Sequence, residues 1–417
     1  MTGSEPEGPV AVDSTRLLPT GCSERIQVLD VLRGVALLGI LITNIQHFSM
    51  FAGAVRNPTL YGDLQGANFW VYALTFNLAF QKFMPIFSML FGAGIMLAAD
   101  RRGAAGQNPS TFHYRRMGFL LLIALAHSYL VWYGDILFLY AVCGALVFPF
   151  RRRSAHFLIW AGVVMLAGQP MMEFVAFAVP GLFGFVNTFQ GMSLQEILAA
   201  DLEAFRGGWM ENFRMRSLYS LEGQTVGFLL HGLWRASGLI LLGMGLYRLR
   251  IMTGEAKRSV YWAFIGVGVG VAIPITAFAF WLSYRAGWGN FWIQQFSLQV
   301  IHWVGIGVSL GWMGIVMLIC HAGCSSWLGR AFGAVGRMAL SNYLLHSLLC
   351  TFIFYGFGLG LYGSVERIGQ LGIVVGIWIL QILVSSLWLR HFRFGPAEWV
   401  WRTLSYGKMQ PFRVSAS

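Results

Sequence analysis

The sequence is dominated by continuous apolar runs of about 20 residues, a length that an α-helix needs to span a bilayer. A transmembrane β-strand would need only about 10 residues of alternating character. Hydrophobic residue types make up 57% of the 417 residues and charged types 11%, whereas soluble domains carry about 25% charged residues. Mean hydropathy is +0.63. We therefore expect an all-α polytopic membrane protein rather than a barrel.

The apolar runs predict about ten transmembrane helices within residues 29–389, plus an interfacial or re-entrant piece at 67–81. Most Lys and Arg residues fall in segments that would share one side of the membrane with both termini, so the positive-inside rule predicts cytoplasmic termini. Residues 1–28 are expected to form a disordered cytoplasmic tail, 181–223 an external loop with amphipathic helices, and 390–417 a basic, aromatic cytoplasmic tail.

The net charge of +12 does not indicate a nucleic-acid partner, because the basic residues form small groups between apolar runs rather than one continuous face. The five cysteines are odd in number and lie mostly in apolar runs, which argues against a disulfide framework. Cys320, His321 and Cys324 resemble half of a metal site, but no second pair completes tetrahedral ligation. We expect no metal.

Polar residues gather in the half of the predicted helices that faces outward. Each ionisable group in hydrocarbon costs at least about 2.5 kcal/mol on insertion scales, so their clustering predicts a hydrated functional cavity. The alternative for any single residue is an interhelical hydrogen bond worth about 0.6 kcal/mol. The candidate residues are Asn44, His47, His127, Asp135, Glu173, His231, Arg235, His302, Asn342 and His346.

Two arginines mark the opposite, cytoplasmic boundary. Asp30 and Arg33 stand three residues apart where the first apolar run begins, so they can pair on one helix face. Arg33 and Arg337 each neighbour a glycine, which would leave the backbone open to a bound group. The guanidinium fork suits phosphate oxygens. The alternative is simple charge anchoring at the membrane interface.

Four motifs occur in order along the chain: Leu29-Asp30-Val31-Leu32-Arg33-Gly34 with Asn44, His127 with Trp132-Tyr133-Gly134-Asp135-Ile136-Leu137, Gly336-Arg337-Met338-Ala339-Leu340-Ser341-Asn342-Tyr343-Leu344, and Gly395-Pro396-Ala397-Glu398-Trp399. In these motifs the chain resembles the YeiB-like family of bacterial membrane proteins, from Arg25 to Lys408. Through the first motif it is also similar, more distantly, to the heparan-α-glucosaminide N-acetyltransferase group of transmembrane acyltransferases.

This resemblance implies a multi-pass protein of the bacterial cytoplasmic (inner) membrane that transfers an acyl group. The donor would be cytoplasmic acetyl-CoA or another acyl-CoA, and the acceptor a small molecule with an amine or hydroxyl, such as a sugar or glycoconjugate, on the far side. The expected partners are thus the lipid bilayer and this acceptor, with a homodimer left open.

The resemblance also suggests roles for the candidate residues. A catalytic histidine is expected beyond the first span, where His47 is the nearest match by position. From the chain's own residues, His127 with Asp135 is the better candidate, since a carboxylate favours the productive imidazole tautomer. Asn44 or Asn342 would donate to the oxyanion. Arg33 and Arg337, with Asp30, would bind CoA, and the acceptor would contact His231, Arg235, Asn342, His346, His302 and Glu173.

A transporter of a small or anionic solute is the competing interpretation of the same polar cavity. Transporters often contain repeats with broken helices at equivalent positions. Pro85, Pro170 and Pro274 do not occupy equivalent places in two halves, which favours an enzyme. A membrane protein that only binds a partner would explain the spans but not the clustered histidines.

Overall fold

The structure, a computed structural model, describes residues 27–179, 191–323 and 327–414. Most of the predicted N-terminal tail, the start of the 181–223 loop and Cys324 therefore lie outside the described residues. Within the described ranges no β-strand occurs, and one isolated β-bridge joins Phe392 and Arg413. The all-α fold expected from the sequence is confirmed for this part of the chain.

The helices of the first half are α1 (Gln27–Ser49), α2 (Gly66–Leu74), α3 (Phe83–Ala104), α4 (Pro109–Leu130), α5 (Leu137–Val147), α6 (Ala155–Ala178), α7 (Leu194–Arg206) and α8 (Trp209–Gln224). Those of the second half are α9 (Leu233–Arg248), α10 (Arg258–Ile265), α11 (Ile273–Arg285), α12 (Phe291–Gly323), α13 (Trp327–Arg337), α14 (Ala339–Phe354), α15 (Arg367–His391) and α16 (Pro396–Tyr406). Short 3₁₀ turns are η2 (Ala52–Val55), η3 (Pro58–Leu60) and η5 (Phe148–Arg152), and π-helical turns are η4 (Thr75–Ala79), η7 (Phe228–Gly232) and η8 (Gly266–Ala272).

Seven helical segments of the described chain are long and apolar enough to cross a membrane, which makes this a multi-pass membrane protein by length and composition. They are α1, α2 with α3, α6, α8 with α9, α10 with α11, α12 and α15. Three further spans expected from the sequence correspond to α4, α5 and α14. Of these, α14 is apolar but has only 16 residues, and α5 has 11 residues. Helix α4 has 22 residues, but Arg115 and Arg116 lie about two turns after its start.

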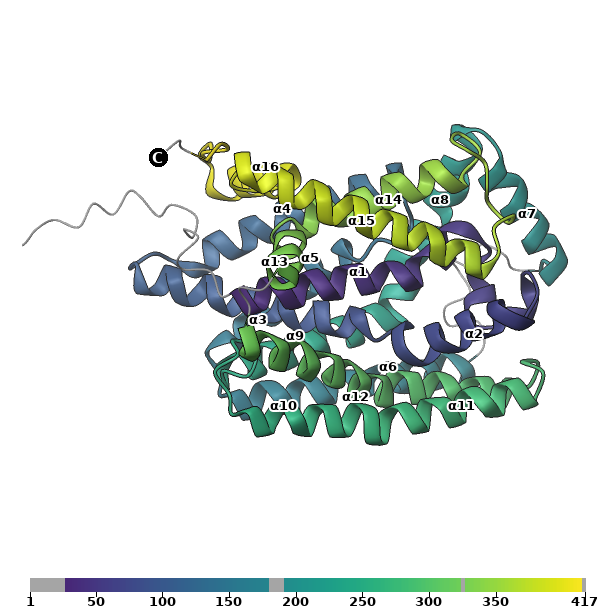
Figure 1. Ribbon diagram of the computed structural model, residues 1–417, viewed down its shortest axis with the longest axis horizontal. Helices are drawn as coiled ribbons and strands as arrows, with labels where there is room; N and C mark the ends of the chain where they lie inside the picture. The colour runs from purple at the N-terminus through teal and green to yellow at the C-terminus, as the bar shows by residue number, and fades with distance from the viewer. Residues whose placement is uncertain (1–26, 180–190, 324–326, 415–417) are drawn as a thin grey trace, which may run out of the picture.

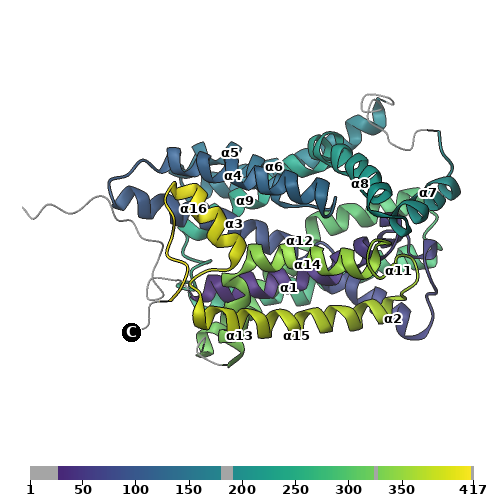
Figure 2. The same cartoon turned by 90° about the horizontal axis from the view of Figure 1, so that it is seen from above.

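The helices lie roughly along one direction, and α1 runs through the middle of the bundle (Figures 1 and 2). The start of α1 and helix α16 lie at one end, which we call the basic end, and α2 and α7 lie at the other, the far end (Figure 1). Helix α1 packs against α3, α12, α13, α14 and α15, and α9 packs against α3, α5 and α6.

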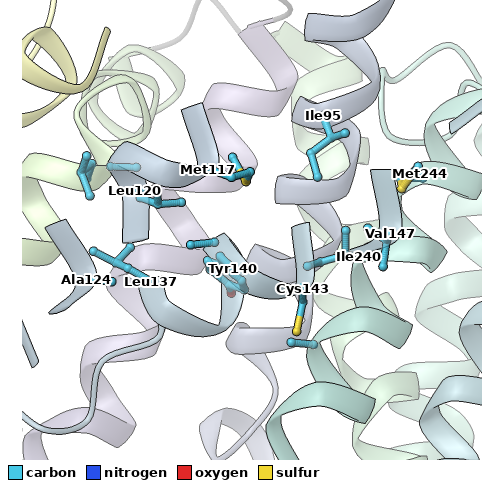
Figure 3. Close-up of a cluster of buried hydrophobic side chains, with 14 of the residues drawn as sticks. Ile95, Met117, Leu120, Ala124, Leu137, Tyr140, Cys143, Val147, Ile240 and Met244 are labelled. Atoms are coloured by element: carbon cyan, nitrogen blue, oxygen red, sulfur yellow. The ribbon is translucent and has the colours of Figure 1, made fainter. Parts of the chain in front are cut away.

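The largest apolar core joins α4, α5 and α9 to α1 and α3 (Figure 3). Met117 and Leu120 of α4 meet Tyr140 and Cys143 of α5, and Ile240 of α9 closes the cluster. All five are buried. Two further apolar clusters lie toward the far end, one around Phe48 and Phe205 and one around Tyr72 and Phe280, so apolar packing extends along the bundle.

Helices α1 and α13 cross at two glycines in the sequence motifs. A Cβ atom on Gly336 would lie 1.8 Å from the backbone oxygen of Asp30, and one on Gly34 would lie 2.0 Å from that of Phe332. No real Cβ atom approaches an oxygen so closely. These glycines therefore bring two backbones into contact, and the expectation that they leave the backbone open to a ligand was wrong.

We predict that Gly336→Ala lowers stability by about 1–3 kcal/mol, the usual cost of overpacking a close contact. Gly333→Ala in the same helix is the control, because its Cβ would meet Val31 at an ordinary 3.7 Å. Thermal unfolding in detergent should show a lower Tm for Gly336→Ala and an unchanged or higher Tm for Gly333→Ala. Equal Tm values for both variants would contradict the close crossing.

Candidate functional site

A cavity of about 680 Å³ lies toward the far end, within the size range of small-molecule sites. Its walls come from α1, the chain between η4 and α3, α6, η7 with α9, and α12. The polar lining is Thr43, Asn44, His47, Arg56, Gln81, Gln169, Glu173, His231, Arg235, Gln295, Gln299 and His302. Six of the ten polar candidate residues named in the sequence analysis therefore line one cavity.

The carboxylate of Glu173 connects three sides of this cavity. Its Oε1 accepts from Gln169 Nε2 at 2.9 Å and pairs with His231 Nδ1 at 3.0 Å. Its Oε2 accepts from Gln299 Nε2 of α12 at 2.9 Å. Both oxygens thus act as acceptors, which is the arrangement that an ionised carboxylate requires. Glu173 is an anion held by donors from α6, η7 and α12.

His231 is the most accessible ionisable partner of this carboxylate. An ionised carboxylate can only accept, so with Glu173 ionised His231 Nδ1 donates to it and the neutral ring carries its lone pair on Nε2. The side chain is 46% exposed and lines the cavity. It lies in the π-helical turn η7, and such turns occur often at functional sites. Glu173 and His231 together have the geometry of an oriented general base.

His302 lies close to this pair, but its Nδ1 accepts a hydrogen bond where that of His231 donates one. Its Nδ1 lies 2.7 Å from Arg235 Nη1, and its Nε2 lies 2.9 Å from the backbone oxygen of Leu166. Since arginine only donates, Nδ1 must accept and Nε2 must donate, so the ring is neutral. His302 orients Arg235 and cannot take up a proton without losing that bond.

Arg235 is itself only 6% exposed. Its Nη1 is shared between the ring and the backbone oxygen of His302, while its Nε and Nη2 have no hydrogen-bond partner among the described residues. Lys82, which is fully buried, lies within electrostatic range of Arg235. Glu173 is the one carboxylate among the described residues lining the cavity. The cavity lining therefore carries more positive than negative charge, because Arg56 and Arg235 line it together with Glu173.

The helical conformation is interrupted between η4 and α3, and the residues of this break form part of the cavity wall. Gln81 has φ +59°, and Lys82 Nζ turns back to donate to the backbone oxygen of Phe76 at 2.7 Å. Helix α12 satisfies carbonyls freed by the break, since Ser309 Oγ donates to Lys82 O and Trp312 Nε1 to Leu78 O. Irregular backbone at this depth is tolerated because protein buries it.

His127 and Asp135 are hydrogen-bonded to each other, as expected from the hairpin sequence, but they lie away from this cavity. His127 Nδ1 lies 2.7 Å from Asp135 Oδ1, and the two side chains are 2% and 1% exposed. The other Asp135 oxygen accepts from the backbone N–H of Phe138 at 2.8 Å and so caps α5. His127 Nε2 is buried without a partner among the described residues. The pair holds the α4–α5 turn, and its catalytic role stays a prediction.

Asn342 and His346 lie in a buried network between α14 and α15. Asn342 Nδ2 donates to Ser385 Oγ at 2.9 Å, and Gln381 Nε2 donates to the backbone oxygen of Asn342 at 2.9 Å. His346 Nε2 lies 2.6 Å from Gln381 Oε1 and therefore donates to it. Neither residue lines the cavity, so the structure does not bring them to the other candidates.

The basic end contains a separate cluster of cations. Arg33 bonds Asp30 at 2.7 Å, as expected. Arg116 of α4 stacks on Trp401 of α16, with its guanidinium 4.2 Å from the ring centre. Burial lowers the pKa of Arg402, while Tyr406, Glu398 and Asp30 raise it and the positive charge of Arg33 has a smaller lowering effect. Sequence reasoning missed Arg116 and Arg402 because they come from helices far from Arg33 in the chain.

Arg56 is the main cavity residue that sequence reasoning missed. It follows η2 in what was predicted to be an external loop, and it lines the cavity beside His47. Burial lowers the pKa of Arg56, while the negative charge of Glu173 raises it. A signal was available, because Arg56 is the only cation between Arg33 and Lys82.

We predict that a cysteine at position 231 reacts with a membrane-impermeant thiol reagent, whereas one at 127 does not. His231→Cys and His127→Cys would be made with Cys22 and Cys324 replaced by Ser, because Cys143, Cys320 and Cys350 are already buried. Mass spectrometry after timed labelling gives the rates. Fast labelling is expected for His231→Cys alone, since only His231 lines the cavity. Equal rates would contradict this geometry.

Comparison with known proteins gives the family. Residues 246–408 match the family described as "Protein of unknown function (DUF418)". The protein "Uncharacterized protein YeiB" of Escherichia coli (strain K12) is 32% identical, over 92% of this chain and 96% of its own length. "Uncharacterized protein YxaH" of Bacillus subtilis (strain 168) is 30% identical, over 95% of this chain and 98% of its own length. The chain belongs to the YeiB-like family.

Proposed function

We propose that this protein is a membrane acyltransferase that uses Glu173 and His231 to activate an acceptor in the cavity. The observation that supports this proposal is the accessible imidazole of His231, oriented at 3.0 Å by a carboxylate that accepts two further hydrogen bonds. An imidazole held in this way can act as a general base, a role that contributes about 10²- to 10⁴-fold to a rate.

The proposed chemistry is a single acyl transfer. His231 Nε2 takes the proton from an acceptor hydroxyl or amine while the acceptor atom attacks the thioester carbonyl of acyl-CoA. The carbon–sulfur bond then breaks, and the imidazolium, stabilised by Glu173, returns the proton to the departing CoA thiolate. Asn44 lines the cavity and is proposed to donate to the oxyanion. Asn342 is less suited, because its amide N–H groups are bonded to Val335 and Ser385.

Acyl-CoA is proposed to enter from the basic end. There Arg33, Arg116 and Arg402 can hold its phosphates, with Asp30 orienting Arg33 and Arg337 nearby as a further candidate. Ile40 lines the cavity seven residues along α1 from Arg33, which corresponds to about 10 Å of helix. We propose ten membrane spans, with the basic end and both termini in the cytoplasm of the bacterial inner membrane.

Transport of an anionic solute is the second candidate. It is supported by the break between two helices at Phe80 and Gln81, which line the cavity, because transporters often bind their substrates at broken helices. Packing between the cavity and the basic end restricts both candidates. A Cβ atom on Gly92 would lie 2.1 Å from the backbone oxygen of Ile240, and one on Gly243 would lie 2.0 Å from that of Met89. Neither a hydrated solute nor the acyl-CoA chain can therefore pass between α3 and α9 unless these two helices separate.

We predict that His231→Ala lowers the rate of acyl transfer by about 100-fold or more, and that Glu173→Gln lowers it less, because a neutral amide still orients the ring. The assay follows transfer of radiolabel from acetyl-CoA to native lipid and polar extracts, using protein in nanodiscs. His156→Ala, at the exposed opposite end of α6, is the matched control and should keep full activity.

Two results would overturn this assignment. Full activity in His231→Ala with activity lost in His127→Ala would move the base to the buried pair with Asp135. If no acyl-CoA is consumed with any extract, while proteoliposomes take up an anion in a His231-dependent manner, the protein is a transporter.

A further inference from the structure

The cavity opens beside four aromatic residues, which we call the aromatic rim: Phe174 and Phe177 of α6, and Phe291 and Trp292 of α12. The Phe177 ring lies 6.2 Å from both the Phe291 and the Trp292 rings, centroid to centroid. All four line the cavity, yet Phe174 and Trp292 are each 69% exposed. The rim therefore belongs both to the cavity and to the outer surface of the bundle.

The outer face of α6 continues this rim as an apolar stripe. Trp160, Val164, Met171 and Phe174 recur at helical spacing, which places them on one face. Each is at least 66% exposed. Exposed apolar side chains on a helix long enough to cross a membrane are expected to contact lipid tails. The aromatic rim is thus continuous with a surface suited to lipid.

The cavity interior, in contrast, is suited to an anion. Arg56 and Arg235 line it, and buried Lys82 lies within electrostatic range of Arg235. Glu173, the one lining carboxylate among the described residues, is already bonded to Gln169, His231 and Gln299. Arg235 Nε and Nη2 are buried without partners there. The charge of Glu173 acts on both Arg56 and Arg235, but one carboxylate cannot balance two guanidiniums. The remaining positive charge at membrane depth is costly, and a bound anion would lower that cost.

We infer that the ligand of this cavity is a membrane lipid with an anionic headgroup, whose headgroup binds at Arg56 and Arg235 while its tails leave past the aromatic rim. A water-soluble anion would account for the cations but not for a rim continuous with the lipid-facing stripe. A neutral lipid would account for the rim but not for the excess positive charge. Resting on the proposed function, the inference identifies this lipid as the acyl acceptor, through a headgroup hydroxyl near His231.

Binding can be measured without acyl-CoA, on the full-length protein in detergent. The probes are dihexanoyl phosphatidylglycerol, dihexanoyl phosphatidylcholine and glycerol phosphate, with affinity taken from native mass spectrometry or thermal stabilisation. We expect the phosphatidylglycerol to bind more tightly than either other probe. One cation contributes about 1 kcal/mol to anionic-lipid binding, so Arg56→Gln should weaken phosphatidylglycerol binding about fivefold and leave phosphatidylcholine binding unchanged.

Two further variants separate the contributions. Phe177→Ala should weaken binding of both lipids, because the tails lose a contact, and should leave glycerol phosphate unaffected. Arg285→Gln is the control for charge, since Arg285 is exposed at the end of α11 and does not line the cavity. It should change none of the affinities.

The inference is overturned if phosphatidylglycerol binds no better than phosphatidylcholine, if glycerol phosphate binds as tightly as the lipid, or if Arg56→Gln and Arg285→Gln behave alike. Its failure can be distinguished from that of the proposed function. Selective lipid binding without acyl transfer would remove the enzyme and keep the lipid site. Acyl transfer to a soluble acceptor without lipid binding would support the enzyme and exclude the lipid site.

Discussion

The interaction on which the cavity depends is the carboxylate of Glu173 and its three donors. Gln169 lies one turn earlier in α6, His231 comes from η7, and Gln299 comes from α12, so one side chain connects three separate walls. Without this anion, Arg56 and Arg235 would have no opposite charge among the described lining residues. The contact between Glu173 and His231 Nδ1 also fixes the tautomer of His231. Structure and chemistry therefore share one residue, and changes to it are expected to affect both.

The two ends of the bundle are built on different principles. Toward the basic end, glycines bring backbones together, at the α1–α13 crossing and between α3 and α9, and the apolar core fills the remaining space. Toward the far end, the helices surround polar groups, and the chain is irregular at Gln81 and at the π-helical turn around His231. Apolar clusters around Phe48 and Phe205 and around Tyr72 and Phe280 pack the far end as well, so the polar cavity lies between packed regions that can position its residues.

Sequence reasoning identified the fold class because length and apolarity of a helix are local properties. It also found six residues of the cavity, since a polar residue within an apolar run is visible without a structure. It favoured His127 as the catalytic histidine because Asp135 is only eight residues away along the chain. The carboxylate that contacts His231 is Glu173 in another helix, so this pair could not be recognised from the sequence. The expectation that Gly34 and Gly336 leave room for a ligand was wrong, because glycine is equally suited to a close crossing of two helices. Arg56 was overlooked as a loop residue because its position over the cavity depends on tertiary packing.

Photo-crosslinking is the measurement that tests the central claim most directly. An acyl-CoA with a diazirine at the end of a short acyl chain would be bound to the protein in nanodiscs, irradiated, and the labelled peptides identified. The account predicts label on residues that line the cavity, in α6 and in the segment around His231, because the acyl group must reach the Glu173–His231 pair. Label confined to the basic end, or to the hairpin around His127 and Asp135, would contradict it.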